Sequence, residues 1–290
     1  MRHDDPTSDR GAGPFASLYD RARESLLTVD TTETTVETSA GQTAVLQAGD
    51  PTAPPLVVLQ GGNVTAPVTL AWVQRLADEY RLLAPETPGE PARTRTEPPA
   101  SYGRWVTDVF DGLCIDRAPA VGISHGGGVL LEAAAHAPDR IAAAALVVPA
   151  GFGVSPSLSL ARVVGLSLLY RLRPSERVLD AALSPLFTES VDGVAPVVRE
   201  TVATALRTAD LRAEFPGPEG PQALARFDAP TLVAGAGRDP FFPAAWLHER
   251  AGEYLPGATH RTLARERHFL SPTGQASVVS QCRSLLRDVS

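Results

Sequence analysis

One serine in this chain stands in a pattern that can make its hydroxyl reactive. Ser124 is the centre of Gly122-Ile123-Ser124-His125-Gly126, a GxSxG sequence between an apolar run and a helical pattern. A chain that turns from strand to helix so abruptly forces the serine into a strained conformation that exposes Oγ. Glycine is needed two positions away on either side because larger side chains would collide there. The pattern predicts a nucleophile rather than an ordinary hydroxyl in a glycine turn.

A serine hydroxyl is a weak nucleophile until a base accepts its proton, and histidine is the usual base. We expect His268 to be that base, because it follows a predicted strand and so lies at the sheet edge where ligands bind. The alternative is a histidine in a surface loop. The other five histidines are excluded by their positions. His3 lies in the leader, His125 directly follows the serine, and His248 falls within a predicted helix. His136 and His260 lie at the wrong end of a predicted helix and strand.

A carboxylate must orient the imidazole. Asp239 also follows a predicted strand, which places it at the same sheet edge as the base. The alternative is an aspartate that caps a turn or helix, a role that Pro240 at the next position would suit. Asp139 and Asp228 instead fall at the opposite rim. Serine, aspartate and histidine then follow one another along the chain in the order typical of one particular fold.

The oxyanion that forms on attack needs two main-chain N–H donors. His125, directly after the nucleophile, is expected to supply one. Gly62 is expected to supply the other, from the glycine loop after the predicted strand 56–59, since glycine lets the main chain approach a reacting carbonyl. Gln60 and Asn63 flank this loop and are candidate substrate-pocket residues. Asn63 could instead cap the following turn.

The elements that must position these residues alternate along the chain. Short apolar runs separated by helical patterns predict βαβ units and a mostly parallel sheet flanked by helices, the α/β class. An N-terminal hairpin is expected, with further strands and intervening helices after it. The expected strands are 34–38, 43–47, 56–59, 81–84, 118–123, 142–148, 231–234 and 259–263. The expected helices are 68–80, 102–113 and 125–136.

Residues 151–226 interrupt this alternation and predict a helical lid. Three helices are expected there, at 158–171, 176–186 and 194–208. The chain then divides into a leader with a lead-in helix (1–29), a core (30–150 and 227–290) and the lid. Apolar lid residues could form a wall over the site that favours a hydrophobic acyl or alcohol group, or simply the interior of the lid. These residues are Val154, Leu158, Leu160, Val163, Val164, Leu166, Leu168 and Leu169.

Composition excludes several classes of protein. The net charge of −7 leaves no basic surface for nucleic acid. All 26 basic residues are arginine, which rules out Schiff-base and Ser-Lys chemistry. Cys114 and Cys282 form no CxxC and no Cys/His cluster, which argues against a zinc site or a disulfide framework. We expect no cofactor, no metal and no nucleic-acid partner, and the oligomeric state stays open.

The N-terminus predicts a cytoplasmic protein. Residues 1–13 are charged and lack the apolar stretch of a secretory signal, so we expect a disordered leader. The most apolar helical stretch, 158–172, is interrupted by Arg162 and Arg171 and falls short of a membrane span. We therefore expect no membrane partner.

Residues from about 30 to 290 resemble the α/β-hydrolase superfamily, most closely its carboxylesterase-type branch with a helical lid. The resemblance implies that Ser124 is the nucleophile, His268 the general base and Asp239 its orienter, with Gly62 and His125 as the oxyanion hole. The segments that carry it are 57–62, 83–89, 122–126, 230–239 and 267–269.

Three positions depart from the family pattern. Gln60 stands where a histidine is usual before the glycines, Glu86 where an aspartate is usual, and Arg267 where a glycine often precedes the catalytic histidine. None of these changes removes a reacting group. Gln60 and Arg267 place unfamiliar polar side chains near the site, so they bear on the type of substrate rather than on the chemistry.

The expected function is hydrolysis of an ester, or a related acyl bond, of a small hydrophobic substrate through an acyl-enzyme. A serine nucleophile argues against dehalogenase and epoxide hydrolase chemistry, which needs a carboxylate. Thioester, lactone, amide and C–C hydrolysis and hydroxynitrile lyase chemistry stay compatible with the same triad, because a fold does not select among them. A catalytically silent ligand-binding protein and a metal-dependent hydrolase are the alternatives from other classes.

Overall fold

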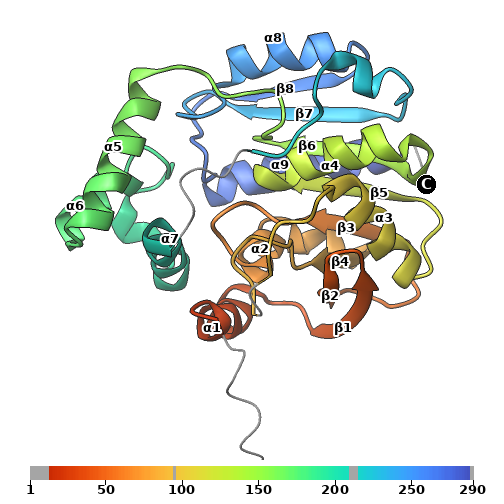
Figure 1. Ribbon diagram of the computed structural model, residues 1–290, viewed down its shortest axis with the longest axis horizontal. Helices are drawn as coiled ribbons and strands as arrows, with labels where there is room; N and C mark the ends of the chain where they lie inside the picture. Colours follow the sequence, from red (N-terminus) through yellow and green to blue (C-terminus); the bar gives the residue numbers. More distant parts are fainter. Residues whose placement is uncertain (1–12, 94–95, 209–214, 288–290) are drawn as a thin grey trace, which may run out of the picture.

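The computed structural model describes residues 13–93, 96–208 and 215–287. Most of the expected leader and residues 209–214 of the expected lid lie outside these ranges. One eight-stranded sheet, in the order β1-β2-β4-β3-β5-β6-β7-β8, forms the centre of the described chain (Figure 1). The strands are β1 (Thr31–Thr38), β2 (Gly41–Ala48), β3 (Pro55–Leu59), β4 (Arg81–Pro85), β5 (Ala118–Ile123), β6 (Ile141–Val147), β7 (Thr231–Ala236) and β8 (Thr259–Leu263).

The sheet is mostly parallel, as predicted. Among the strands of the described chain, only β2 runs in the opposite direction to the rest. It pairs with β1 as the expected hairpin, in a register that brings Thr38 opposite Gly41, and it pairs with β4 on its other side. All later pairs, from β3–β4 to β7–β8, are parallel. The carboxyl ends of these parallel strands therefore meet at one edge of the sheet. The predicted α/β class is confirmed.

Helices cover both faces of the sheet. α3, α4 and α8 pack in one apolar cluster with the sheet, and α2 and α9 pack in another. The helices are α1 (Ala16–Leu26), α2 (Ala66–Val73), α3 (Tyr102–Gly112), α4 (His125–His136), α5 (Leu158–Leu172), α6 (Glu176–Leu183), α7 (Pro196–Thr208), α8 (Ala244–Tyr254) and α9 (Pro272–Arg287).

The apolar runs of the central strands follow from this two-sided burial. Successive side chains of a strand point to opposite faces, so a strand covered on both faces must be apolar at every position. In β3, Val57 and Leu59 belong to the cluster of α3, α4 and α8, whereas Leu56 and Val58 belong to that of α2 and α9. All four side chains are fully buried.

Helix ends differ most from the predictions. The helix expected at 68–80 begins two residues earlier, as α2, and continues after Val73 as a short 3₁₀ helix, Gln74–Asp78. α6 ends at Leu183, three residues before its predicted end. The helix expected from 194 begins at Pro196, because proline lacks an N–H and suits the first turn of a helix.

α5, α6 and α7 lie together to one side of the sheet (Figure 1). Val163 is buried there, against residues of α6 and α7. Half of the apolar residues considered above do not belong to the interior of the lid. Leu158 is 91% exposed, and Val164, Leu168 and Leu169 are each more than 40% exposed. Within the described ranges no helix is both long and apolar enough to cross a membrane.

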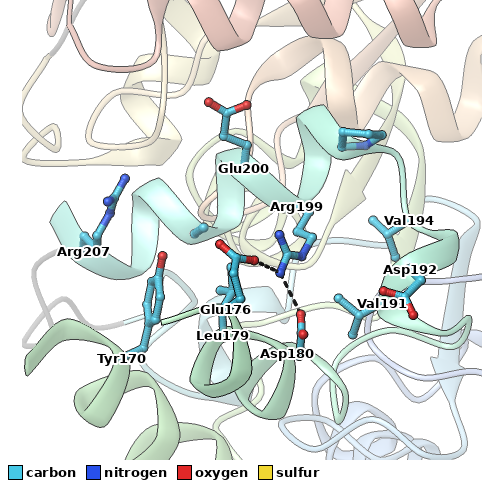
Figure 2. A pocket seen from close by; sticks show the side chains of 12 residues that line it. Tyr170, Glu176, Leu179, Asp180, Val191, Asp192, Val194, Arg199, Glu200 and Arg207 are labelled. Carbon is cyan, nitrogen blue, oxygen red and sulfur yellow. Dashed lines mark hydrogen bonds and ion pairs between the residues drawn. The ribbon is translucent and has the colours of Figure 1, made fainter. Parts of the chain in front are cut away.

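A cavity of about 660 Å³ opens between α5, α6 and α7. Figure 2 shows charged side chains around it, with Arg199 of α7 reaching across to Glu176 and Asp180 of α6. The lining of this cavity includes no member of the predicted triad. These ion pairs connect α6 to α7.

Candidate active site

Ser124 occupies the sharp turn between β5 and α4. Its φ of +51° and ψ of −114° are strained for a residue with a side chain. A Cβ on Gly122 would lie 2.4 Å from the carbonyl oxygen of Gly126, and a Cβ on Gly126 would lie 2.2 Å from that of Leu59. The turn therefore requires both glycines. It is anchored to β6 because the Ser124 N–H donates to the Val147 carbonyl at 2.9 Å.

The structure brings the three predicted triad residues together. Ser124 Oγ lies 2.9 Å from His268 Nε2, and His268 Nδ1 lies 2.7 Å from Asp239 Oδ2. All three residues are buried, with exposed fractions of 9% or less. An ionised carboxylate can only accept hydrogen bonds, so Nδ1 carries the proton and Nε2 is left to accept one from the serine. This arrangement can generate a serine nucleophile.

Main-chain donors hold the Asp239 carboxylate in place. Its Oδ1 accepts the N–H of Phe241 at 2.8 Å and the N–H of Phe242 at 3.1 Å. The other oxygen, Oδ2, is then directed at the imidazole. Asp239 therefore caps a turn, as the alternative interpretation expected, and the same turn holds the carboxylate in its contact with His268.

The loop that carries His268 is tied to residues 185–188, between α6 and α7. Phe269 donates its N–H to the Leu186 carbonyl at 2.8 Å, and Thr188 donates its N–H to the Phe269 carbonyl at 3.0 Å. Arg267 donates a guanidinium N–H to the Pro185 carbonyl at 3.2 Å. The arginine that replaces a frequent glycine thus fastens this loop.

Aromatic rings surround the imidazole. The ring centroids of Phe241, Phe242 and Phe269 lie 5.1, 5.8 and 6.0 Å from that of His268. Phe215 packs edge-on against Phe241 and Phe242 and is 47% exposed. The environment of the base is therefore apolar on several sides and reaches the surface at Phe215.

The two expected oxyanion donors lie side by side. A Cβ on Gly62 would be 3.2 Å from His125 Cβ, so the glycine loop approaches the residue after the nucleophile closely. Within the described ranges, no hydrogen bond uses the N–H of either residue, whereas Gly61 donates its N–H to Thr69 Oγ1. Both N–H groups can therefore serve a substrate oxygen.

The two candidate pocket residues have different surroundings. Gln60 is fully buried: its Nε2 donates to the Val64 and Pro91 carbonyls, and its Oε1 accepts the Thr87 N–H. It fastens the glycine loop to the segment after β4, and this corrects the expectation that it lines the pocket. Asn63 is exposed, with a φ of +60° that asparagine tolerates.

Sequence reasoning missed Glu90. Its carboxyl Oε2 accepts the Asn63 N–H at 2.7 Å, and Oε1 lies 3.2 Å from His125 Nδ1. Burial raises the pKa of Glu90 from 4.5 to about 7 and lowers that of His125 from 6.5 to about 4. Glu90 follows β4, so the strand-end rule that selected Asp239 and His268 could also have found it.

A second buried carboxyl group in this segment makes stability depend on pH. Burial raises the pKa of Glu86 from 4.5 to about 7. The folded state then binds a proton more tightly than the unfolded state, so this contribution is complete below about pH 4.5 and is lost as pH rises towards 7.

The free energy of unfolding of the wild type should therefore fall by about 2 kcal/mol relative to that of Glu86→Gln between pH 4.5 and 7. Urea denaturation of both proteins at several pH values measures it. A difference between the two proteins that stays constant with pH would contradict the assignment.

Comparisons with known proteins identify the family of this chain. The model of the alpha/beta hydrolase family matches residues 56–277. The uncharacterized carboxylesterase nap of Bacillus subtilis is 32% identical over 126 residues, which cover 40% of each chain. Carboxylesterase YbfK of the same organism is 27% identical over 140 residues, 47% of each chain. The chain thus matches less than half the length of these two relatives.

The fold also matches solved structures over nearly its whole length. The structure of naproxen esterase from Bacillus subtilis superposes with a TM-score of 0.77 at 21% identity, covering 94% of this chain and 96% of that one. The family match spans most of the present chain, including Ser124, Asp239 and His268. The chain belongs to the α/β-hydrolase family, as its sequence motifs predicted.

Proposed function

We propose that this protein is a serine esterase that cleaves an ester bond of a small hydrophobic substrate through an acyl-enzyme. The observation that carries the proposal is the hydrogen-bonded series from Ser124 through His268 to Asp239. The two relatives named as carboxylesterases support the choice of an ester over the other acyl bonds.

In the first half of the reaction, Ser124 Oγ attacks the ester carbonyl carbon while His268 Nε2 takes its proton. The carbonyl oxygen becomes an oxyanion, which accepts hydrogen bonds from the N–H groups of Gly62 and His125. The tetrahedral species then collapses. Its bond to the alkoxy oxygen breaks, and His268 gives its proton to the departing alcohol, leaving the acyl group on Oγ.

In the second half, water repeats the attack. His268 takes a proton from the water as its oxygen bonds to the acyl carbon, and the same two N–H groups bind the new oxyanion. Collapse breaks the bond to Oγ and returns the proton to Ser124, which releases a carboxylic acid. Asp239 keeps its negative charge throughout and stabilises the imidazolium that forms twice in the cycle.

The phenylalanine rings support a hydrophobic substrate. Phe241, Phe242 and Phe269 surround the base, and Phe215 extends this apolar surface outwards. We assign residues 151–226 the part of a lid, because segment 185–188 bonds to the loop that carries His268. The cytoplasmic location stays a prediction from residues 1–13.

A series of p-nitrophenyl esters of increasing acyl length tests this assignment. Each methylene buried against the rings should raise kcat/KM by about fourfold, until the apolar surface is filled. Phe215→Ala should reduce that gain, whereas Leu158→Ala, a change at an exposed side chain of α5, should not. A flat series would contradict a hydrophobic acyl site. No turnover on any ester would favour the ligand-binding alternative.

A further inference from the structure

One buried carboxyl group outside the triad touches both segments that form the proposed oxyanion site. Glu90 Oε2 accepts the Asn63 N–H at 2.7 Å, and Oε1 lies 3.2 Å from His125 Nδ1. Gly62 fits between these contacts: a Cβ there would lie 3.2 Å from His125 Cβ and 3.6 Å from either carboxyl oxygen. Glu90 therefore lies close to Gly62, one expected donor, and beside the side chain of His125, the other.

Among the residues that the structure describes, none offers this carboxyl group a positive charge. His125, on α4, is neutral at pH 7 because burial lowers its pKa to about 4. Tyr102, on α3, packs edge-on against His125 and donates its hydroxyl to the Pro88 carbonyl. These two are the titratable groups that face Glu90, and no arginine pairs with it in the part of the chain that the structure describes.

Ionisation of Glu90 changes the charge close to the two residues expected to bind the oxyanion. Its side chain is only 15% exposed, and burial raises its pKa to about 7, so it changes charge within the range where esters are assayed. A negative charge close to Gly62 and to the side chain of His125 opposes the build-up of negative charge on the substrate oxygen. That effect is strong where water is largely excluded.

We propose that Glu90 is a positioning residue of the oxyanion site, which holds the Gly62–Asn63 loop against the His125 turn and weakens the site when it ionises. The inference rests on the proposed esterase function. It predicts two separable effects, one of the hydrogen bond to Asn63 and one of the charge. Glu90→Gln removes only the charge, because its amide oxygen can still accept the Asn63 N–H. Glu90→Ala removes both.

The test compares kcat and KM for a p-nitrophenyl ester between pH 6 and pH 9. At pH 6, Glu90→Gln should match the wild type within about twofold. At pH 8.5 its kcat should exceed that of the wild type by about tenfold, with little change in KM. Glu90→Ala should have a kcat about tenfold lower than that of Glu90→Gln at every pH, because the loop loses its acceptor. Glu90→Gln alone suffices if the alanine variant fails to fold.

Glu86→Gln is the matched control. It removes a buried carboxyl group of the same segment whose pKa is raised to a similar value. This group accepts the main-chain N–H of Arg93 rather than one from the glycine loop. Its activity profile should follow that of the wild type. Superimposable profiles for Glu90→Gln and the wild type would overturn the inference.

Labelling separates this failure from that of the proposed function. A fluorophosphonate should label the wild type at Ser124. If it does and the profiles still superimpose, only the part assigned to Glu90 is wrong. If the wild type neither reacts with the probe nor hydrolyses any ester, both proposals are overturned.

Discussion

Ser124→Ala should lower kcat for ester hydrolysis by about 10⁵- to 10⁶-fold, because no other group can form the acyl-enzyme. The residual rate should reflect substrate binding and the oxyanion donors alone. Alanine removes only the hydroxyl, and the strained backbone at this position is kept. Steady-state kinetics on a p-nitrophenyl ester measure the loss, and thermal melting verifies the fold.

Ser155→Ala is the control for this change. Ser155 has the same exposed fraction as Ser124, 9%, but lies outside the triad. Its alanine variant should keep the wild-type kcat. A Ser124→Ala protein that retains more than about a hundredth of the wild-type rate would contradict the assignment of the nucleophile, since loss of a triad serine costs far more.

The second large effect is expected from Asp239→Asn, at about 10⁴-fold in kcat. The two N–H groups of Phe241 and Phe242 will hold the amide oxygen in the place of Oδ1. The amide NH₂ then faces His268 Nδ1 as a donor, which moves the imidazole proton to Nε2. An imidazole with its proton on Nε2 cannot accept one from Ser124.

Asp228→Asn controls for the loss of one carboxylate, because Asp228 precedes β7 at the opposite rim of the sheet. Its kcat should equal that of the wild type. A loss of less than tenfold for Asp239→Asn would show that the carboxylate does not set the imidazole tautomer. The KM of both variants should stay near the wild-type value, since neither side chain binds the ground-state ester in this account.

The strand-end rule explains why the triad could be found from the sequence. Ser124 and Asp239 follow strands with apolar runs, whereas His268 follows the mostly polar strand Thr259–Leu263. Parallel strands bring their carboxyl ends together at one edge of the sheet. Gly122 and Gly126 carry the same kind of information, because a Cβ at either position would clash with a main-chain carbonyl oxygen. Such local and topological signals do not depend on which side chains pack where.

Other features depend on packing between distant segments. Gln60 looked like a pocket residue because it flanks the glycines, yet it bonds three main-chain groups in other parts of its own loop and in the segment after β4. Leu158 fitted an apolar lid stripe, but which face of α5 is covered depends on where α6 and α7 lie. The strand-end rule could have pointed to Glu90, but its burial beside His125 depends on the path of the loop after β4.

The most direct test of the central claim is peptide mapping by mass spectrometry after reaction with a fluorophosphonate. We predict one adduct per chain, on the peptide that contains Ser124, and none after Ser124→Ala or after prior denaturation. An unmodified Ser124 in folded protein, or an adduct on another residue that persists in Ser124→Ala, would contradict a reactive serine activated by His268 and Asp239.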